Sequence, residues 1–145
     1  MKNIISAILL LAIFTTAHGQ TKDSIAKDIE EKFQIINLDS GYLIKTLENE
    51  QFLEHVTDGG GILTGYFKNG QIKKITEQLG LSSGIKTFEF YFWDEQLIFV
   101  YEKEEDFSYI EATGSLDYSK LELAFEGRYR FNNGKLIETE IQGKK

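Results

Sequence analysis

Three short stretches of the chain repeat one pattern, and this pattern constrains the fold more than any other feature. Residues 66–71 read YFKNGQ, residues 91–96 read YFWDEQ and residues 129–135 read YRFNNGK. In each stretch aromatic residues precede a short polar turn, and aliphatic residues follow it. Asn-Gly between two alternating segments is a strong hairpin signal, because both residues tolerate the positive φ of a type I′ turn. The pattern predicts three β-hairpins.

The middle turn departs from this pattern. Asp94-Glu95 stands where the other two turns have Asn-Gly, and glutamate disfavours positive φ. We therefore expect this turn to be longer or of another type. With their flanking strands the three hairpins make about six strands, joined as a meander with one longer connection at residues 104–119.

The third hairpin indicates how side chains divide between the two faces of the sheet. Period-two alternation places an apolar set on one face: Leu121, Leu123, Phe125, Gly127, Tyr129 and Phe131. A charged set falls on the other face: Glu122, Glu126, Arg128 and Arg130. We therefore predict a sheet with one buried face and one solvated face.

One segment has the period of a helix. In residues 23–36 the apolar side chains recur every three or four positions and form one stripe. Asp23 or Ser24 can cap its first turn. The stripe needs an apolar surface, and a helix packed on one face of an antiparallel sheet is the simplest arrangement. The predicted fold class is α+β, with an N-terminal helix packed on an antiparallel sheet of about six or more strands built from three successive β-hairpins.

Two segments leave alternatives open. Residues 42–56 combine strand-like alternation with helix-like spacing, and we favour one or two short strands there, before the glycine-rich break at residues 57–61. Residues 87–94 carry aromatic side chains on both faces of a predicted strand. Such a strand is either covered on both sides or lends one face to a ligand. We favour the covered strand, because buried aromatic side chains dominate the energetics of protein cores.

The N-terminus has the layout of a secretory signal peptide. Lys2 precedes an apolar run at residues 4–14, and Ala17 and Gly19 fit a signal peptidase site. We predict that residues 1–19 are removed and that residues 20–145 form a single domain, exported to the periplasm or secreted. The apolar run is shorter than the ~20 residues of a membrane-spanning helix, so we expect no stable membrane insertion after cleavage.

Charge excludes some partners. Without residues 1–19, 15 cations face 23 carboxylates, a net charge of −8. An acidic domain repels the phosphate backbone, so we expect no nucleic-acid partner. A cationic protein partner is compatible with this charge.

The side chains that nucleophilic catalysis and transition-metal binding require are scarce. There is no cysteine, and His55 is the only histidine outside the predicted signal peptide. The acidic run EKEEDF at residues 102–107 lacks the ligand spacing of a calcium-binding loop. Paired carboxylates for glycoside hydrolysis require a cleft geometry that residue spacing does not specify. We predict no catalytic residue, no metal site and no cofactor.

The phrase Tyr/Arg-Phe-x-Asn-Gly-x-Leu/Ile, at residues 66–72, 91–97 and 130–136, resembles the hairpin repeats of MORN-type and antitoxin-like repeat proteins. The chain as a whole, with its leader, helix, glycine-rich break and hairpins, is similar to small exported proteins of Gram-negative bacteria. These resemblances imply an exported protein built from β-hairpins. They imply no activity and no catalytic residues.

These observations favour a non-enzymatic binding protein, such as an inhibitor or an immunity-type protein. Its partner is expected to be a protein or an envelope component. Tyrosine and tryptophan are enriched at interface hot spots, so the predicted contact residues are Tyr66, Tyr91, Trp93 and Tyr101. Arg128 and Arg130 can hold an anionic group or pair with glutamates on the adjacent strand. The alternative is a small-ligand carrier or a carboxylate-based hydrolase, with a pocket between helix and sheet.

Overall fold

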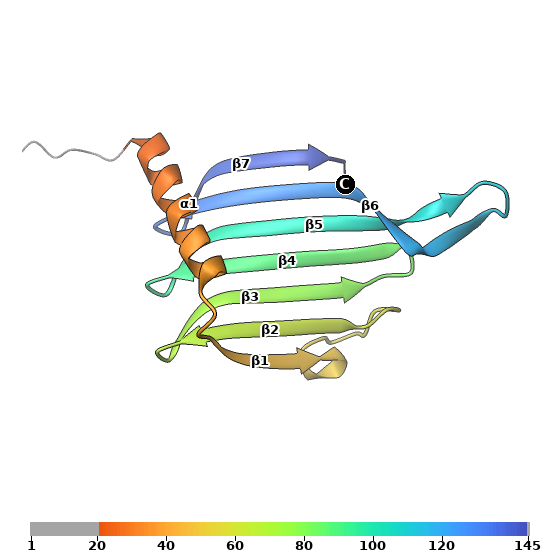
Figure 1. Ribbon diagram of the computed structural model, residues 1–145, viewed down its shortest axis with the longest axis horizontal. Helices are drawn as coiled ribbons and strands as arrows, with labels where there is room; N and C mark the ends of the chain where they lie inside the picture. The colour runs from red at the N-terminus through yellow and green to blue at the C-terminus, as the bar shows by residue number, and fades with distance from the viewer. Residues whose placement is uncertain (1–20, 145) are drawn as a thin grey trace, which may run out of the picture.

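The computed structural model describes residues 21–144 and shows one α-helix packed on a seven-stranded antiparallel sheet. Helix α1 spans Lys22–Leu38, and a short 3-10 helix, η1, spans Asn49–Gln51. The strands are β1 (Leu43–Glu48), β2 (Gly61–Lys68), β3 (Gln71–Gly80), β4 (Gly84–Trp93), β5 (Gln96–Ile110), β6 (Ser115–Asn132) and β7 (Lys135–Gly143). They lie side by side in chain order (Figure 1). The α+β class is confirmed, and the predicted signal peptide lies outside the described residues.

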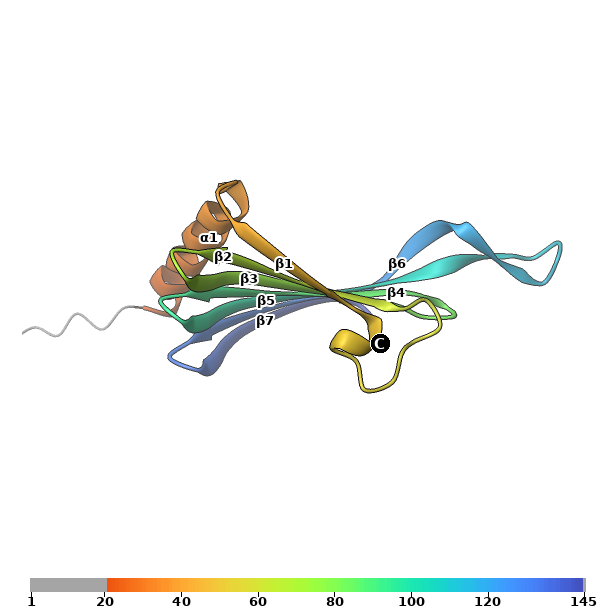
Figure 2. The same cartoon turned by 90° about the horizontal axis from the view of Figure 1, so that it is seen from below.

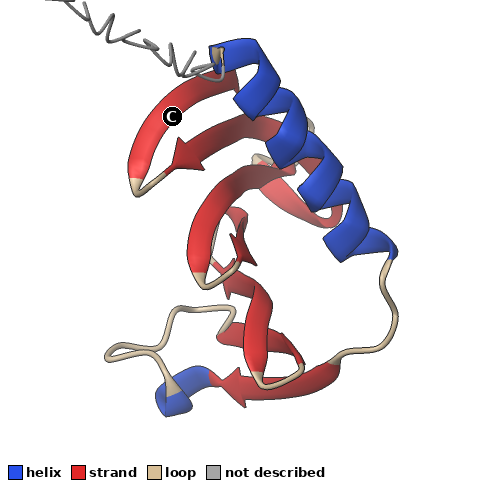
Figure 3. Cartoon of the chain, turned by 90° about the vertical axis from the view of Figure 1, so that its left-hand side faces the viewer, coloured by secondary structure: helices blue, strands red, loops and turns tan. Residues whose placement is uncertain are grey.

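Helix α1 lies across one end of the sheet, on one of its two faces (Figures 1 and 3). Its N-cap is Thr21, whose hydroxyl accepts a hydrogen bond from the backbone N–H of Ser24 at 3.2 Å. The prediction of Asp23 or Ser24 as the cap is wrong, because the helix begins at Lys22 and both residues already lie in its first turn. We call the face that carries α1 the α1 face and the opposite one the open face.

The segment at residues 42–56 contains one strand rather than two. Strand β1 ends at Glu48, which precedes η1 as its N-cap and forms a capping box with Gln51. Phe52 and Leu53 then pack beside Gly61, at the start of β2. Figure 2 shows this loop on the side of the sheet opposite α1.

All three turns after an aromatic segment have the same geometry. Asn69 and Gly70 have φ of 52° and 77°, and Asn133 and Gly134 have φ of 50° and 72°. Asp94 and Glu95 have φ of 47° and 64°, and their flanking residues Trp93 and Gln96 pair directly. This is also a two-residue turn with positive φ at both positions. The expectation of a longer or different turn is wrong, because the right-handed twist of the flanking strands favours type I′ geometry.

Replacing Glu95 with glycine is expected to raise the free energy of unfolding by about 0.5–1 kcal/mol. Left-handed backbone costs a residue with a Cβ about 1–2 kcal/mol, and the greater freedom of glycine in the unfolded chain offsets part of the gain. Urea unfolding followed by circular dichroism measures the difference. Gln96→Gly, one position beyond the turn, is the matched control and should not stabilise the protein. Equal effects of the two changes would refute the assignment of strain to Glu95.

Each of these hairpins has a β-bulge at the same place, in the strand that follows the turn. The pairing shifts leave Lys73, Ile98 and Ile137 as the extra residues in β3, β5 and β7. A bulge lets two successive side chains reach one face. Ile98 and its neighbour Phe99 therefore both pack beneath α1, and Ile137 packs against the same core.

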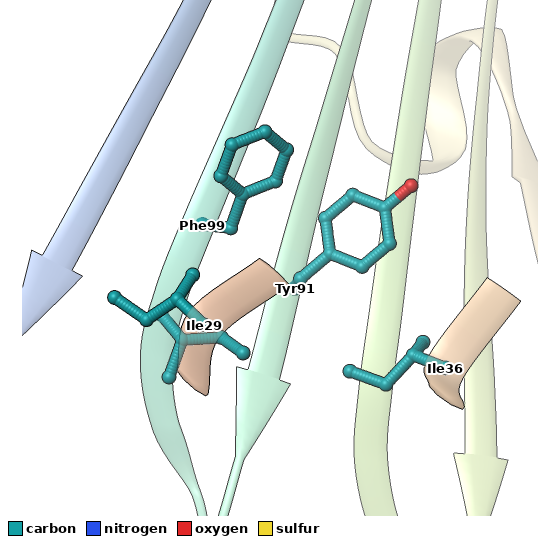
Figure 4. Close-up of a cluster of buried hydrophobic side chains, with 5 residues drawn as sticks. Ile29, Ile36, Tyr91 and Phe99 are labelled. Carbon is teal, nitrogen blue, oxygen red and sulfur yellow. The ribbon is translucent and has the colours of Figure 1, made fainter. Parts of the chain in front are cut away.

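The core between helix and sheet is small and combines isoleucine with aromatic side chains (Figure 4). Ile29 and Ile36 descend from α1 onto Tyr91 and Phe99 of the sheet. The ring of Phe33 lies 4.8 Å from that of Tyr91 and 5.0 Å from that of Phe99, measured between centroids. This cluster positions α1 over β4, β5 and β6.

The helix packs on the face that the third hairpin predicted to be solvated. Tyr91 pairs with Phe99, and Phe99 pairs with Arg130, so all three share the α1 face. The members of the Tyr129 set from Phe125 onward therefore point to the open face. A bulge at Ala124 in β6 turns Leu121 and Leu123 to the α1 side, so the predicted set does not share one face. The prediction of the buried face is wrong, because Tyr91, Phe99 and the bulged isoleucines supply the helix with its apolar floor.

Candidate functional site

The six predicted contact residues all lie on the α1 face, by the register of the sheet. They are Tyr66 in β2, Tyr91 and Trp93 in β4, Tyr101 in β5, and Arg128 and Arg130 in β6. The structure does not bring them together as one exposed strip. Two are buried under α1, and the other four lie at different places around it.

Tyr91 is the most deeply buried of the six, with 1 % of its surface exposed. Its hydroxyl lies 2.6 Å from Glu89 Oε2 and 3.1 Å from Asn37 Oδ1. Lys74 Nζ lies 3.0 Å from Glu89 Oε1. Burial and the neighbouring Glu89 carboxylate raise the pKa of Tyr91 far above its usual range. Tyr91 therefore joins the end of α1 to the sheet and is covered by the helix.

Arg130 is buried as well, and three carboxylates surround it. Its Nη1 lies 2.5 Å from Glu140 Oε1 and 3.3 Å from Glu138 Oε2, both in β7. Its Nη2 lies 3.7 Å from Glu30 Oε2 in α1. Of the two roles left open for Arg130, the structure supplies the cross-strand glutamate pairing. The guanidinium links the helix to the edge of the sheet.

Tyr101 and Arg128 line a cleft of about 300 Å³ beside α1. Arg128 donates to Glu126 at 2.9 Å and lies 5.9 Å from the centre of the Tyr101 ring. Burial, with the Glu126 carboxylate as a smaller cause, raises the pKa of Tyr101. A small-ligand carrier or a carboxylate-based hydrolase, the alternative prediction, would have its pocket in this cleft between helix and sheet.

The two carboxylates in the cleft already have partners. Glu30 accepts a hydrogen bond from Gln34 at 2.9 Å and lies beside Arg130. Glu89 is held by Lys74 and Tyr91. Acid–base catalysis needs two carboxylates poised for different protonation states. The contacts of Glu30 and Glu89 with their neighbours instead connect α1 to the sheet and the strands to one another.

Trp93 lies at the other flank of α1, in a cleft of about 400 Å³. Lys32 Nζ and Lys73 Nζ lie 5.6 and 5.8 Å from the centre of its ring. Tyr66 lies further along the sheet, 6.0 Å from the ring of Tyr42 in an edge-on contact. Trp93 and Tyr66 are half-buried, and lysine stems or a neighbouring ring occupy their surroundings.

One group of exposed large side chains lies where the sequence predicted a connection. Residues 104–119 are not a loop, since β5 runs to Ile110 and β6 starts at Ser115. Strand β4 pairs with β5 no further than Asp106, and β7 pairs with β6 only from Phe125 onward. The two strands therefore project beyond the sheet as a ribbon at residues 107–123, seen at the right of Figures 1 and 2.

The ribbon exposes aromatic and aliphatic side chains. Tyr118 is 70 % exposed and Tyr109 is 64 % exposed. Phe107 stabilises Tyr118 by an edge-on contact at 5.0 Å between ring centroids, and Ser108 donates to Glu122 at 2.8 Å. Alternation of apolar and polar residues at 107–110 and 116–123 was the signal that could have predicted the two strands. The acidic run at residues 102–107 is more typical of a solvated loop, and it therefore favoured the prediction of a connection.

Several remaining observations limit the chemistry of the described residues. His55 lies exposed in the loop that follows η1. Among residues 21–144, no three His, Cys, Asp or Glu side chains group closely enough to hold a metal ion. In the same part of the chain, no helix has the length and apolar character needed to cross a membrane.

The described residues thus contain three candidate binding surfaces. They are the projecting ribbon, the two clefts beside α1, whose charged groups already contact other side chains, and the sheet face opposite α1. The chain was also compared with known proteins. No family model, no curated protein and no solved structure matches it.

Proposed function

We propose that the chain is an exported, non-enzymatic interaction protein that binds a basic protein through the β5–β6 ribbon, in the manner of an inhibitor or immunity protein. The leader-like sequence of residues 1–19 supports export. The sheet, with its hairpins and helix, serves as the platform that holds the ribbon away from the body of the protein. The observation that carries the proposal is the exposure of Tyr109 and Tyr118 on a projecting element.

The shape of the ribbon supports this role. A two-stranded element with no further neighbours gains little stability from pairing alone. Exposing several large apolar side chains on such an element is costly for solubility unless they serve recognition. Tyrosine anchors of this kind contribute much of the energy at protein interfaces.

The charge of the ribbon defines the partner. Residues 107–123 contain three carboxylates and one lysine, a net charge of −2. Charges at the rim of an interface steer association and disfavour partners of the same sign. A protein with a basic groove that accepts a narrow ribbon is the complementary partner.

The test is affinity capture with residues 20–145 as bait and envelope extract plus culture medium of the source cell as prey. The captured protein is identified and its affinity is measured by calorimetry. The test variant is Tyr109→Ser with Tyr118→Ser. The control variant is Ile35→Ser with Leu38→Ser, which removes apolar side chains of similar exposure from α1. Circular dichroism verifies that both are folded.

We expect a basic partner at one-to-one stoichiometry, whose affinity falls at least about 30-fold in the ribbon variant, as for hot-spot residues. The α1 variant should bind normally, and high salt should slow association with the unmodified bait. A partner that is acidic, or that binds the ribbon variant equally well, would refute the proposal. Capture of no protein would also count against it.

A further inference from the structure

The open face of the sheet is the second unusual surface of this protein, and it is independent of the ribbon. No α-helix of the described residues lies on it (Figure 2). Domains are normally built from two packed layers, because a sheet with an apolar face must cover it. Here α1 covers part of one face only.

The open face is apolar at its centre. Phe90 pairs directly with Ile75 on one side and Val100 on the other, so these side chains share the face. The rings of Phe88 and Phe90 stack with centroids 6.1 Å apart and an interplanar angle of 19°. A hollow of about 240 Å³ continues the surface over Leu63 and neighbouring side chains towards β1. All five side chains are partly buried.

The face is also unusually smooth, because two aromatic rings lie down along it. A Cβ placed on Gly65 would meet the Phe67 ring at 2.8 Å, and one placed on Gly127 would meet the Tyr129 hydroxyl at 2.6 Å. Each ring therefore covers the glycine two residues before it. A surface of flattened rings suits a second sheet, which packs about 10 Å away over interdigitating side chains.

Charged groups on the open face are mostly balanced within it. Lys86 Nζ lies 3.7 Å from Glu102 Oε1 and also pairs with Glu104. Glu102 is 4 % exposed and accepts a hydrogen bond from Tyr129 at 3.1 Å. Lys45 and Glu77, which share this face by register, add one charge of each sign, and Asp106 at the end of the β4–β5 pairing adds one carboxylate. Together these groups carry a net charge of −2. The face thus carries little of the net negative charge that would repel a copy of the same chain.

We propose that two copies of the chain pack their open faces together as a two-sheet sandwich. Seven strands at ~4.8 Å spacing, and ~8 residues at ~3.3 Å rise, give a face of roughly 750 Å². A standard specific interface buries about 800 Å² per partner. A two-fold interface needs only a self-complementary patch. A basic partner, of the kind that the ribbon is suited to, would gain no charge attraction from this nearly balanced face.

The arrangement leaves the ribbon accessible. Figure 2 shows the ribbon bending toward the side of the sheet that carries α1, away from the open face. The loop containing Phe52 and Leu53 lies at one end of the open face and would form part of the rim. The dimer does not depend on the proposed function of the ribbon, and either can fail without the other.

The first experiment measures mass by light scattering after size exclusion, with residues 20–145 loaded at about 50 μM, within the affinity range of interfaces of this size. We expect a dimer. Phe90→Glu, at the centre of the open face, should weaken dimerisation at least about 100-fold. Gln78→Glu adds the same charge to an exposed position on the α1 face and should leave the dimer intact. A monomer at all concentrations, or a dimer that survives Phe90→Glu, would overturn the proposal.

A second measurement covers the case in which Phe90→Glu does not fold. The chain has no cysteine, so Val100→Cys and Gln78→Cys each introduce one thiol, on the open face and the α1 face. In the dimer the thiol of Val100→Cys should react with a maleimide at least about 10-fold more slowly than after dilution to monomer. That of Gln78→Cys should react at the same rate at both concentrations. Equal rates for Val100→Cys would overturn the proposal, as would protection that requires another protein.

Discussion

Replacing Tyr91 with alanine will lower the free energy of unfolding by about 3–5 kcal/mol, the range for removing a large buried aromatic side chain. The ring contacts those of Phe33 in α1 and Phe99 in β5, with centroid distances of 4.8 and 5.7 Å. Its removal leaves a cavity that the two remaining rings fill only in part. It also removes the hydroxyl that contacts Glu89 and Asn37.

Urea unfolding followed by circular dichroism measures this loss. Tyr118→Ala is the matched control, since Tyr118 is 70 % exposed on the ribbon, and its removal should change stability by only about 1 kcal/mol, through the lost ring contact with Phe107. Tyr91→Phe separates packing from hydrogen bonding. It keeps the ring and should lose about 1–3 kcal/mol, because Glu89 and Asn37 lose a buried partner. If Tyr91→Ala and Tyr118→Ala had similar effects, α1 would not be docked as described.

Replacing Arg130 with alanine will lower the free energy of unfolding by about 2–3 kcal/mol. Removing one partner of a buried ion pair costs about 3–5 kcal/mol, and the figure is reduced here because Glu30 and Glu140 are about half exposed. The Arg130 side chain is only 11 % exposed and joins α1 to β7. Its loss leaves three carboxylates close together without the cation between them.

Arg128→Ala, two residues earlier on the same face of β6, is the control. The side chain of Arg128 is 48 % exposed and pairs with Glu126. A surface pair of this kind contributes less than about 1 kcal/mol, and salt screens it. The difference between the two variants should therefore persist at 1 M salt, where the Debye length is about 3 Å. Equal losses for Arg128→Ala and Arg130→Ala would contradict the burial of Arg130.

Strand β4, which carries Tyr91 and Trp93, illustrates how far the sequence predicts the candidate site. Alternation correctly indicates that Tyr91 and Trp93 share one face of a strand. It does not indicate which face the helix covers, because aromatic side chains occupy both faces of β4. The bulges decide the matter, since they bring Ile98 and Ile137 to the α1 face. A bulge depends on the twist of paired strands, and single-strand periodicity does not contain that information.

The turns divide in the same way. Asn69-Gly70 and Asn133-Gly134 were predictable, because their own residues favour positive φ. Asp94-Glu95 adopts the same turn although glutamate prefers negative φ. The strands on either side impose this turn geometry. The ribbon is hard to predict from the sequence for a related reason. Acidic residues are typical of solvated loops, and only pairing between β5 and β6 makes this segment a projecting element.

The order of the strands has a consequence for how the chain folds. Every strand pairs with neighbours in sequence, so each pairing closes a short loop and a hairpin forms within microseconds. Helix α1 is made first, yet it rests on β4, β5 and β6, and its Asn37 contacts a tyrosine 54 residues further along. Contacts of such separation form late. The sheet surface that carries Tyr91 and Phe99 is therefore expected to form before α1 docks on it. Dissociation of α1 from the sheet is the expected first step of unfolding.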